Sequence, residues 1–418
     1  WIEETGASTV MDGRAVADFD GRSLAVEAVV SPDVGDLTLA LEIGSPEGRR
    51  WTFTAERVTP GSFRARIPFD AIGPRLWSPD DPALYGLRYR LRRGGADVDA
   101  VESYFGLRKI TWSSKGIAIN DVPTYLRMVL VQGYYPGGSY TPRGPTAIER
   151  DIRAMKEMGF NGARIHEKIE SPYFHYLCDR LGLLTTYEMP SFYRATRRVF
   201  REYEGELREI IARDAMHPSC VAWVLFNETW GIWRVYARRS PTRRFVTAMI
   251  ALLKMADLTR PVIDNSGWEH LRTDIVDVHH YLKTAALARD FYARLRARDP
   301  ATLGRLSRFG VIRFYVANTI GTETRAVFID GDAANADAPW LLSEYGGFGW
   351  YAATDGGSAI DKIESYTRDA VASGLFCGYC LTQLYDVERE TNGLLTFDRA
   401  PKVDPRRMRE ANAILPPA

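Results

Sequence analysis

The spacing of hydrophobic residues changes near residue 107. Before that point apolar and polar residues alternate in short runs, as in Ser23–Val29, Leu37–Ile43 and Leu84–Leu91, and Gly, Pro and Asp residues separate the runs. Alternation with a period of two is typical of strands that bury one face. Residues 1–107 are therefore predicted to form an immunoglobulin-like β-sandwich.

After Phe105-Gly106-Leu107-Arg108, short apolar runs alternate with longer helical stretches. The predicted strands are Tyr125–Val131, Gly162–His166, Leu183–Glu188, Val221–Asn227, Pro261–Asn265, Ile275–Tyr281, Trp340–Glu344 and Leu375–Thr382. The predicted helices are Pro145–Met158, Ser171–Leu181, Glu202–Met216, Thr242–Leu258, Ala285–Arg298 and Ile360–Ser373. This count closes a (β/α)8 TIM barrel over residues 108–418. A doubly wound open sheet is the alternative, but no Gly-rich phosphate loop follows any strand.

Length and charge add three restrictions. A chain of 418 residues fits a small domain plus a barrel, with residues 300–339 inserted as a loop over the barrel mouth. Its 54 basic and 53 acidic residues give a net charge of +1, so neither nucleic acid nor an anionic membrane is expected as a partner. No apolar run reaches the roughly 18 residues needed to span a bilayer.

Four cysteines show no spacing typical of a disulfide framework. The pair in Cys377-Gly-Tyr-Cys380 is open to a redox or metal interpretation, but it lies in an apolar strand without a second pair or suitable histidines nearby. Buried free thiols are the favoured interpretation.

Two glutamates close predicted strands and are the main candidates for chemistry. Glu228 ends an apolar run directly after Asn227, and Glu344 lies between Ser343 and Tyr345. The carboxyl ends of barrel strands meet at one face, so distant acids can become neighbours there. Two such carboxyls are the minimum equipment for cleaving a glycosidic bond, with Glu228 as acid/base and Glu344 as nucleophile. The alternative is a pair of salt-bridged or surface acids.

Several blocks in the same order resemble glycoside hydrolase family 2, which includes β-galactosidases, β-glucuronidases and β-mannosidases. They are Phe105–Ile110, Asp151–Arg164, Leu177–Leu183, His217–Trp223, Phe226-Asn227-Glu228, Ser343-Glu344-Tyr345-Gly346 and Asp386–Leu394 with Tyr385 and Pro401-Lys402. Family members carry a sugar-binding β-domain, an immunoglobulin-like domain and a barrel. Trp1-Ile2-Glu3 resembles the exit from the first of these, so the chain is expected to lack that N-terminal domain.

The resemblance implies roles for individual residues. Glu228 matches the family's acid/base and Glu344 its nucleophile. Asn227 matches the residue that holds the sugar 2-hydroxyl, Tyr281 the tyrosine that bonds the nucleophile, and Arg164 the arginine that orients it. On its own, Arg164 is equally well interpreted as part of a structural ion pair.

The chain departs from the best-known members of the family. Val131–Pro136 replaces the Asn-Arg-His run of the galactosidases, and Phe192 and Arg194 stand where magnesium ligands are expected, so no metal or other cofactor is predicted. The Asn-X-Lys element with which glucuronidases clamp the uronate is absent from the chain. In members of the family, strand eight usually supplies a tryptophan that lies beneath the sugar. No tryptophan occurs in the corresponding segment Leu381–Asp386, so Gln383, Tyr385, Trp230 or Trp350 is expected to take that place.

Weaker candidates follow other strands. His166, Glu188 and Gln132 with Tyr134 are interpreted as sugar contacts, pocket wall or supporting residues. For His279 and His280 no acidic partner is evident, so a metal site is not predicted. Asp386 and Glu388 are interpreted as structural, and the arginine-rich stretch Arg194–Arg201 as a solvated helix face rather than an acidic-partner site.

The predicted function is a retaining exo-β-glycosidase that acts on a terminal β-linked sugar, most similar to a β-galactosidase. The alternatives are a β-glucuronidase, β-mannosidase or galactofuranosidase, a transglycosylase using the same acids, and a non-catalytic carbohydrate-binding homologue. A carbohydrate is the expected partner. The sequence leaves open whether the chain forms a homo-oligomer and whether it acts in the cytoplasm or is secreted.

Overall fold

The computed structural model describes residues 5–32, 35–298, 328–329, 337–348 and 358–416. The chain divides into two compact units. The first comprises Trp1–Lys109 with the short pieces Asp179–Gly182 and Met216–Pro218, and the second comprises the remainder. The division at Lys109 lies close to the boundary expected at residue 107.

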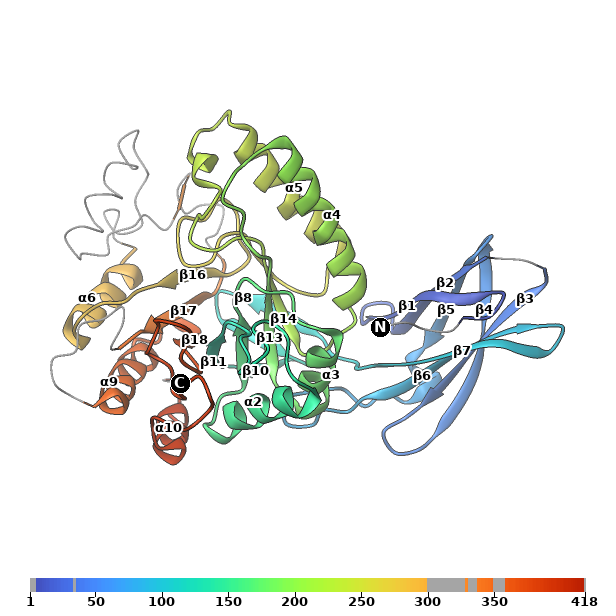
Figure 1. Cartoon of the computed structure of the whole chain (residues 1–418), viewed down its shortest axis with the longest axis horizontal. Coiled ribbons are helices and arrows are strands. Elements are labelled where there is room, and N and C mark those ends of the chain that lie inside the picture. Colours follow the sequence, from blue (N-terminus) through green and yellow to red (C-terminus); the bar gives the residue numbers. More distant parts are fainter. Residues whose placement is uncertain (1–4, 33–34, 299–327, 330–336, 349–357, 417–418) are drawn as a thin grey trace. The chain divides into compact units, whose positions relative to one another are not determined.

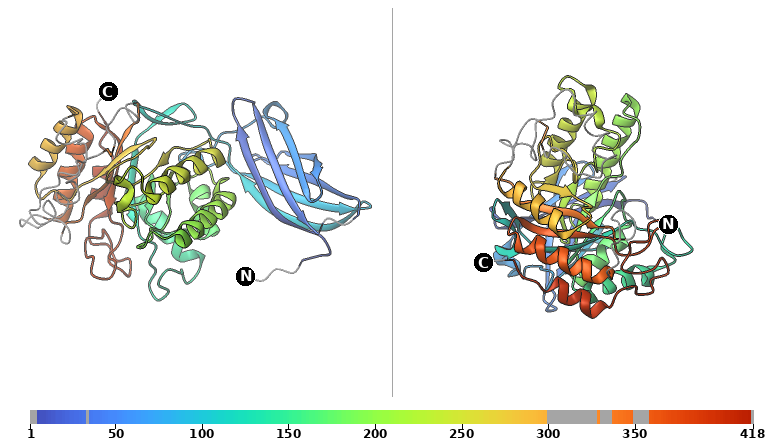
Figure 2. Two further views of the ribbon diagram at one scale, coloured as in Figure 1. Left: turned by 90° about the horizontal axis from the view of Figure 1, so that it is seen from above. Right: turned by 90° about the vertical axis from the view of Figure 1, so that its left-hand side faces the viewer.

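The first unit is an antiparallel β-sandwich. Its strands occur in the order β1-β2-β5-β4-β3-β6-β7, and they appear in blue and cyan in Figures 1 and 2. Alternate residues of β3 and β6 are buried, among them Leu39, Leu41, Leu87 and Tyr89, so the predicted period of two is present. The elements are β1 Thr9–Asp18, β2 Ser23–Ser31, β3 Leu37–Gly44, β4 Arg50–Thr59, β5 Ser62–Pro68, α1 Phe69–Ile72, β6 Tyr85–Arg93 and β7 Ala96–Phe105.

The second unit begins with a small antiparallel sheet and continues as the TIM barrel. The small sheet contains β8 Ile110–Ser113, β9 Gly116–Ile119 and β10 Val122–Thr124. The barrel strands are β11 Leu126–Val131, β12 Gly162–Ile165, β13 Leu184–Glu188, β14 Cys220–Val224, β15 Val262–Ile263, β16 Val276–His279, β17 Trp340–Gly346 and β18 Phe376–Thr382. They pair in the parallel order β15-β14-β13-β12-β11-β18-β17-β16.

The fold class predicted from the sequence is confirmed. All eight predicted barrel strands are present, and β13, β14, β17 and β18 are buried along their whole length, as expected of parallel strands covered on both faces. Between the ends of the sheet, the His279 N–H donates to the Gly267 carbonyl at 3.3 Å. Residues that follow the strands therefore meet around one face of the barrel.

Helices alternate with the strands, and α4 and α5 lie side by side in Figure 1. Several begin with a side chain that caps the first turn, as Thr196 does for α4 and Ser240 does for α5. The helices are α2 Pro145–Glu157, α3 Pro172–Leu181, α4 Arg197–Asp214, η1 Trp233–Tyr236, α5 Pro241–Ala256, α6 Ala285–Arg296, α9 Ala359–Ala372 and α10 Pro405–Asn412.

Three other expectations concern the predicted insertion, the cysteines and membrane-spanning segments. Most of the predicted insertion 300–339, and also Trp350, lies outside the described residues. All four cysteines are free and buried, as predicted, and burial raises the pKa of Cys377 to about 12. Among the described residues, no helix combines the length and the apolarity required to cross a membrane.

Candidate active site

Glu228 lies on a constrained loop directly after β14. Both Glu228, with φ of 49°, and Thr229, with φ of 60°, adopt the left-handed backbone region that non-glycine residues rarely occupy. Two hydrogen bonds hold this turn: Glu228 N–H donates to the Ser266 carbonyl at 3.0 Å, and Thr229 N–H donates to Asn265 Oδ1 at 2.8 Å. Strain of this kind is characteristic of functional positions, where the surroundings enforce one conformation.

Glu344 lies within β17 beside a shift in strand register. Val278 pairs with Leu342 but His279 pairs with Glu344, so Ser343 is an extra residue on the β17 side. A bulge of this kind re-aims the side chains that follow it. Carboxylate oxygens of Glu228 and Glu344 and a ring nitrogen of His279 all lie within 4.8 Å of one another. The two acids predicted from the sequence therefore share one site.

Arg164 connects the charged groups of the site. Its guanidinium donates to Glu188 Oε2 at 2.8 Å, to Glu344 Oε1 at 2.5 Å and to Asn227 Oδ1 at 2.9 Å. The Arg164 side chain is only 3% exposed, so these contacts are little screened by water. The position of Arg164 at the end of β12 thus orients two acids and one amide at once.

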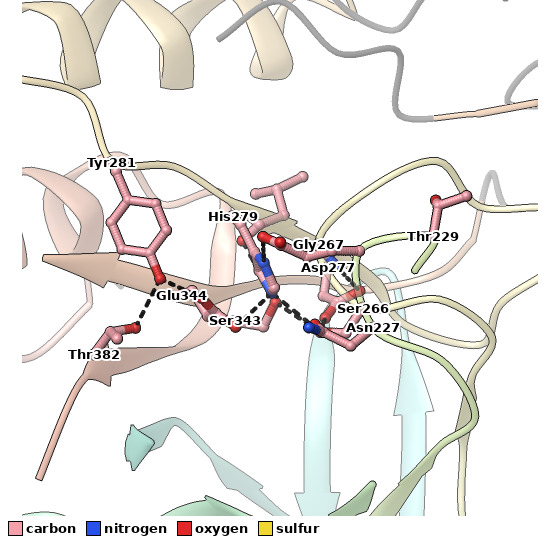
Figure 3. A network of polar contacts seen from close by, with 12 residues as sticks. Asn227, Thr229, Ser266, Gly267, Asp277, His279, Tyr281, Ser343, Glu344 and Thr382 are labelled. Carbon is pink, nitrogen blue, oxygen red and sulfur yellow. Dashed lines mark hydrogen bonds and ion pairs between the residues drawn. The ribbon is translucent and has the colours of Figure 1, made fainter. Parts of the chain in front are cut away.

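Tyr281 donates its hydroxyl to Glu344 Oε2, and the same hydroxyl lies 3.4 Å from Thr382 Oγ1 (Figure 3). Burial and the neighbouring carboxylates of Glu344 and Glu228 raise the pKa of Tyr281, so it remains a hydrogen-bond donor. With Arg164 on Oε1 and Tyr281 on Oε2, both oxygens of Glu344 receive a donor. These bonds fix the orientation of the Glu344 carboxylate in the site.

His279 lies between the two glutamates. Its Nδ1 is 2.9 Å from Glu228 Oε1, and its Nε2 is 3.5 Å from Glu344 Oε1. The expectation that this histidine has no acidic partner was wrong, because the barrel brings to it Glu228 from the loop after β14 and Glu344 from β17. Burial lowers the pKa of His279 to about 4, so the ring is neutral near pH 7. The adjacent His280 faces away and contacts Tyr292 through Nε2 at 2.6 Å.

A row of buried polar groups continues behind His279. Ser266 Oγ lies 3.2 Å from His279 Nε2 and donates to Asp277 Oδ2 at 2.5 Å (Figure 3). His270 follows, with Nε2 3.3 Å from Asp277 Oδ1 and Nδ1 2.7 Å from Asp264 Oδ1. Burial opposes a charge on His270, but Asp264 and Asp277 outweigh it and raise its pKa to about 9.

Glu188 and His166 form a second buried group beside Arg164. His166 Nδ1 lies 3.0 Å from Glu188 Oε1, and the Glu188 side chain is fully buried. Burial opposes its charge, but Arg164 and His166 outweigh it and lower the pKa of Glu188 to about 2. The same pairing raises the pKa of His166 despite its burial. This places Glu188 as a support for Arg164 and His166 rather than in the open part of the site.

The remaining sequence candidates have different surroundings. Gln132, after β11, donates from Nε2 to Gln383 Oε1 and to Glu390 Oε2, both at 2.8 Å. Trp230 is 48% exposed, and its indole N–H donates to Glu228 Oε2 at 3.3 Å. Asp386 forms an ion pair with Lys402 at 2.7 Å, the structural arrangement expected for it.

Two acids and one histidine are grouped as the ligands of a metal ion could be. Glu228, His279 and Glu344 could each direct one donor atom to a common ion. However, Arg164 Nη1 lies 3.2 Å from His279 Nε2 and also donates to Glu344 Oε1 at 2.5 Å. A second cation beside this guanidinium would be repelled. The absence of a catalytic metal remains a prediction.

The sequence interpretation missed the segment that links β15 to the site. Asn265-Ser266-Gly267 supplies hydrogen bonds to the Glu228 turn and contacts to His279. The available signal was Asp264-Asn265-Ser266-Gly267-Trp268, a polar cluster directly after a predicted strand end, which is the position where barrel enzymes carry functional groups.

Sequence comparison then decides the family. A profile described as glycosyl hydrolases family 2 matches residues 12–108, and a second, described as the TIM barrel domain of glycosyl hydrolases family 2, matches residues 144–347. The chain belongs to glycosyl hydrolase family 2. Members of this family are glycoside hydrolases.

Individual relatives of this family 2 chain cover part of it. A beta-galactosidase of Bacteroides ovatus is 31% identical over 168 residues, which is 38% of this chain and 20% of that protein. A beta-galactosidase of Pectobacterium atrosepticum is 29% identical over 224 residues, which is 51% of this chain and 20% of that protein. The chain thus spans about a fifth of the length of these curated relatives.

Solved structures share the fold over nearly the whole chain. A family 2 beta-galacturonidase from Eisenbergiella tayi bound to galacturonate superposes with a TM-score of 0.70 and 17% identity, covering 98% of this chain and 73% of that one. Beta-glucuronidase 2 of Bacteroides uniformis, covalently bound to cyclophellitol-6-carboxylate aziridine, gives 0.71 and 20%, covering 97% and 51%. At these identities the likeness establishes the fold alone.

Proposed function

We propose that the chain is a retaining exo-β-glycosidase with Glu344 as nucleophile and Glu228 as acid/base. The observation that carries this proposal is the short separation of the two acids, since one carboxylate oxygen of Glu228 lies within 4.8 Å of one of Glu344. Carboxyl groups about 5 to 5.5 Å apart suit double displacement, whereas inverting enzymes need about 6.5 to 9.5 Å to admit a water. Glu228 is 20% exposed and Glu344 only 7%, which suits an acid near the leaving group and a shielded nucleophile.

The reaction then has two steps. Glu344 attacks the anomeric carbon while the bond to the glycosidic oxygen breaks and that oxygen takes the proton of Glu228. The product is a glycosyl ester on Glu344 and a free leaving group. Water attacks the anomeric carbon as Glu228 takes its proton, the ester bond breaks, and the sugar leaves with its configuration retained.

A neutral β-hexoside such as a β-galactoside is the proposed substrate. Two cations near the site are already engaged: Arg164 binds Glu188, Glu344 and Asn227, and Lys168 binds Glu170 at 2.8 Å and the carbonyl oxygens of Gly133 and Tyr140. Neither is left to bind the carboxylate of a uronic acid. Relatives named beta-galactosidase support the same substrate class.

Two variants test the roles of the acids. Glu344→Gln is expected to lower kcat for aryl β-glycosides at least 10³-fold, because the covalent step loses its nucleophile. Glu228→Ala is expected to retain turnover of substrates with very acidic leaving groups and to lose about 10²-fold or more for poor ones, because only the latter need a proton. The measurements are steady-state rates over a panel of aryl β-galactosides, β-glucuronides and β-mannosides.

Glu364→Gln is the matched control. Glu364 lies on α9 and forms an ion pair with Arg407 on α10 at 2.8 Å. Its replacement therefore removes a carboxylate that has no role in the proposed chemistry. Unchanged turnover in Glu344→Gln would contradict the proposed nucleophile, and a first-formed sugar of inverted configuration in proton NMR would contradict double displacement. Transfer of the sugar to an added acceptor instead of water would support the transglycosylase alternative.

A further inference from the structure

The two carboxylate oxygens of Glu228 have different surroundings. Oε1 lies 2.9 Å from Nδ1 of the buried His279, whose other ring nitrogen lies 3.5 Å from Glu344. Oε2 accepts the indole N–H of Trp230 at 3.3 Å, and almost half of the Trp230 side chain is exposed. Glu228 therefore has the buried nucleophile on one side and an exposed aromatic ring on the other.

The backbone holds Trp230 in this position. Its N–H donates to the Asn227 carbonyl at 3.0 Å. Gly231 follows with φ of +73°, and a Cβ at this residue would lie only 1.4 Å from the carbonyl oxygen of Phe192. Only glycine permits so close an approach between two segments of backbone. The position of Trp230 is thus set by the packing of the loop that carries it.

A second tryptophan supports the Trp230 ring. The ring centroids of Trp230 and Trp268 lie 5.6 Å apart, with 47° between the ring planes. Trp268 is buried, and it follows Gly267 in the segment after β15. Aromatic rings at this separation attract each other. Trp230 therefore has a fixed neighbour and still presents an exposed surface beside Glu228.

This exposed surface lies where a leaving group is expected. In the proposed reaction Glu228 gives its proton to the glycosidic oxygen, and that oxygen departs with the leaving group. Glu344 marks the position of the sugar whose anomeric carbon is attacked. A ring that contacts Glu228 on its exposed side is consequently next to the leaving group. Tryptophan suits such a contact, because it offers a large apolar face with few rotatable bonds.

We propose that Trp230 is the wall of a leaving-group subsite, against which a ring with an apolar face stacks. This inference rests on the proposed function, which gives Glu228 its role. The ring is either an aromatic group or a second sugar, since both present an apolar face to an indole. Trp230 thus selects among leaving groups, whereas the groups around Glu344 contact the sugar that is transferred.

The first test compares two glycosides of one sugar, the sugar that the aryl glycoside panel selects. Benzyl and methyl β-glycosides release alcohols of similar acidity, so both need the same help from Glu228 and only the first carries a ring. The ratio of their kcat/KM values isolates the ring contact. In Trp230→Ala this ratio is expected to fall by about tenfold. An unchanged ratio would overturn the proposal.

Trp230→Phe separates the ring from its N–H. Phenylalanine keeps an apolar face but cannot donate to Glu228, so the benzyl and methyl rates should fall together and their ratio should remain within about threefold of the original. A ratio as low as that of Trp230→Ala would contradict stacking. A β-linked disaccharide in place of the benzyl glycoside distinguishes the two kinds of ring: a parallel loss in Trp230→Ala extends the subsite to sugars, and a loss with benzyl alone restricts it to aromatic groups.

Trp233→Ala is the matched control. Trp233 lies in η1, three residues further along the chain, is 60% exposed and has the Arg234 guanidinium 5.9 Å from its ring centroid. Its replacement removes a second exposed indole from the same segment and should leave the benzyl-to-methyl ratio unchanged. An equal loss of the ratio in this variant would contradict the assignment to Trp230.

A binding measurement separates this inference from the proposed function. Benzyl and methyl 1-thio-β-glycosides of galactose, glucuronic acid and mannose serve as probes, with tryptophan fluorescence reporting Kd in Glu344→Gln. The benzyl compound should bind about tenfold more tightly, and Trp230→Ala should abolish the difference. This result in a chain that hydrolyses no glycoside would refute the proposed function and leave the subsite intact. Hydrolysis without any preference for the ring would refute the subsite alone.

Discussion

At the scale of single residues, Gly267 determines where the His279 ring can lie. A Cβ at Gly267 would lie 2.1 to 2.2 Å from atoms of that ring, and the backbone there has φ of +80°. Both facts require glycine, since such a contact is impossible and the left-handed conformation is unfavourable for other residues. The absence of one side chain therefore permits the contact between His279 and Glu228.

Gly267→Ala should accordingly damage catalysis more than the size of a methyl group suggests. The His279 ring must move away from Glu228, and kcat/KM is expected to fall at least tenfold, with a loss of about 1 to 3 kcal/mol in the free energy of unfolding. Rates on an aryl β-galactoside and urea unfolding measure the two effects. An unchanged kcat/KM would show that the position of the ring is unimportant for the reaction.

At the scale of elements, the same substitution in α4 is expected to have the opposite effect. Gly205 lies inside this helix, and a Cβ there meets nothing within 4 Å. Gly205→Ala should stabilise the chain by about 0.5 to 1 kcal/mol, because alanine loses less backbone entropy when the helix forms. Urea unfolding should show the gain with kcat/KM unchanged, and a loss of stability would mean that the helix position is more crowded than the structure shows.

The elements were predictable where their hydrophobic pattern is continuous. Buried barrel strands such as β18 need apolar residues on both faces, and their runs are visible in the sequence. The start of α4 was less well predicted: one helix begins at Arg197, after the Thr196 cap, and so joins the last part of the arginine-rich stretch Arg194–Arg201 to the helix expected from residue 202. A cap depends on one hydrogen bond, which periodicity does not reveal.

At the scale of the whole molecule, buried charges make stability depend on pH. The folded state raises the pKa of His270 to about 9, above the unfolded value of about 6.5. The resulting stabilisation is fully present below pH 6.5 and is lost as the pH rises through 9. For Glu188 the folded pKa is lowered to about 2, so its contribution is present above about pH 4.5 and is lost as the pH falls towards 2.

The His270 contribution can be measured directly. Between pH 6.5 and 9 the free energy of unfolding should fall by up to about 3 kcal/mol in the unaltered chain. In His270→Gln the part of this slope that comes from His270 should disappear, because glutamine does not titrate, and the contribution of His166, whose pKa is also raised, should remain. Urea unfolding followed by tryptophan fluorescence at several pH values measures it, and an equal slope in the two proteins would exclude His270 as its source.

By itself, the sequence determined the two-part architecture and the positions of Glu228 and Glu344 near the ends of two barrel strands, because hydrophobic periodicity is a local pattern repeated along the chain. It could not place His279 between those acids, nor Ser266 and Asp277 behind it. These contacts depend on strand register, on the shift at Ser343 and on the room left by Gly267. Only the closed barrel brings together residues that are remote in the chain and sets which atom of each faces its neighbour.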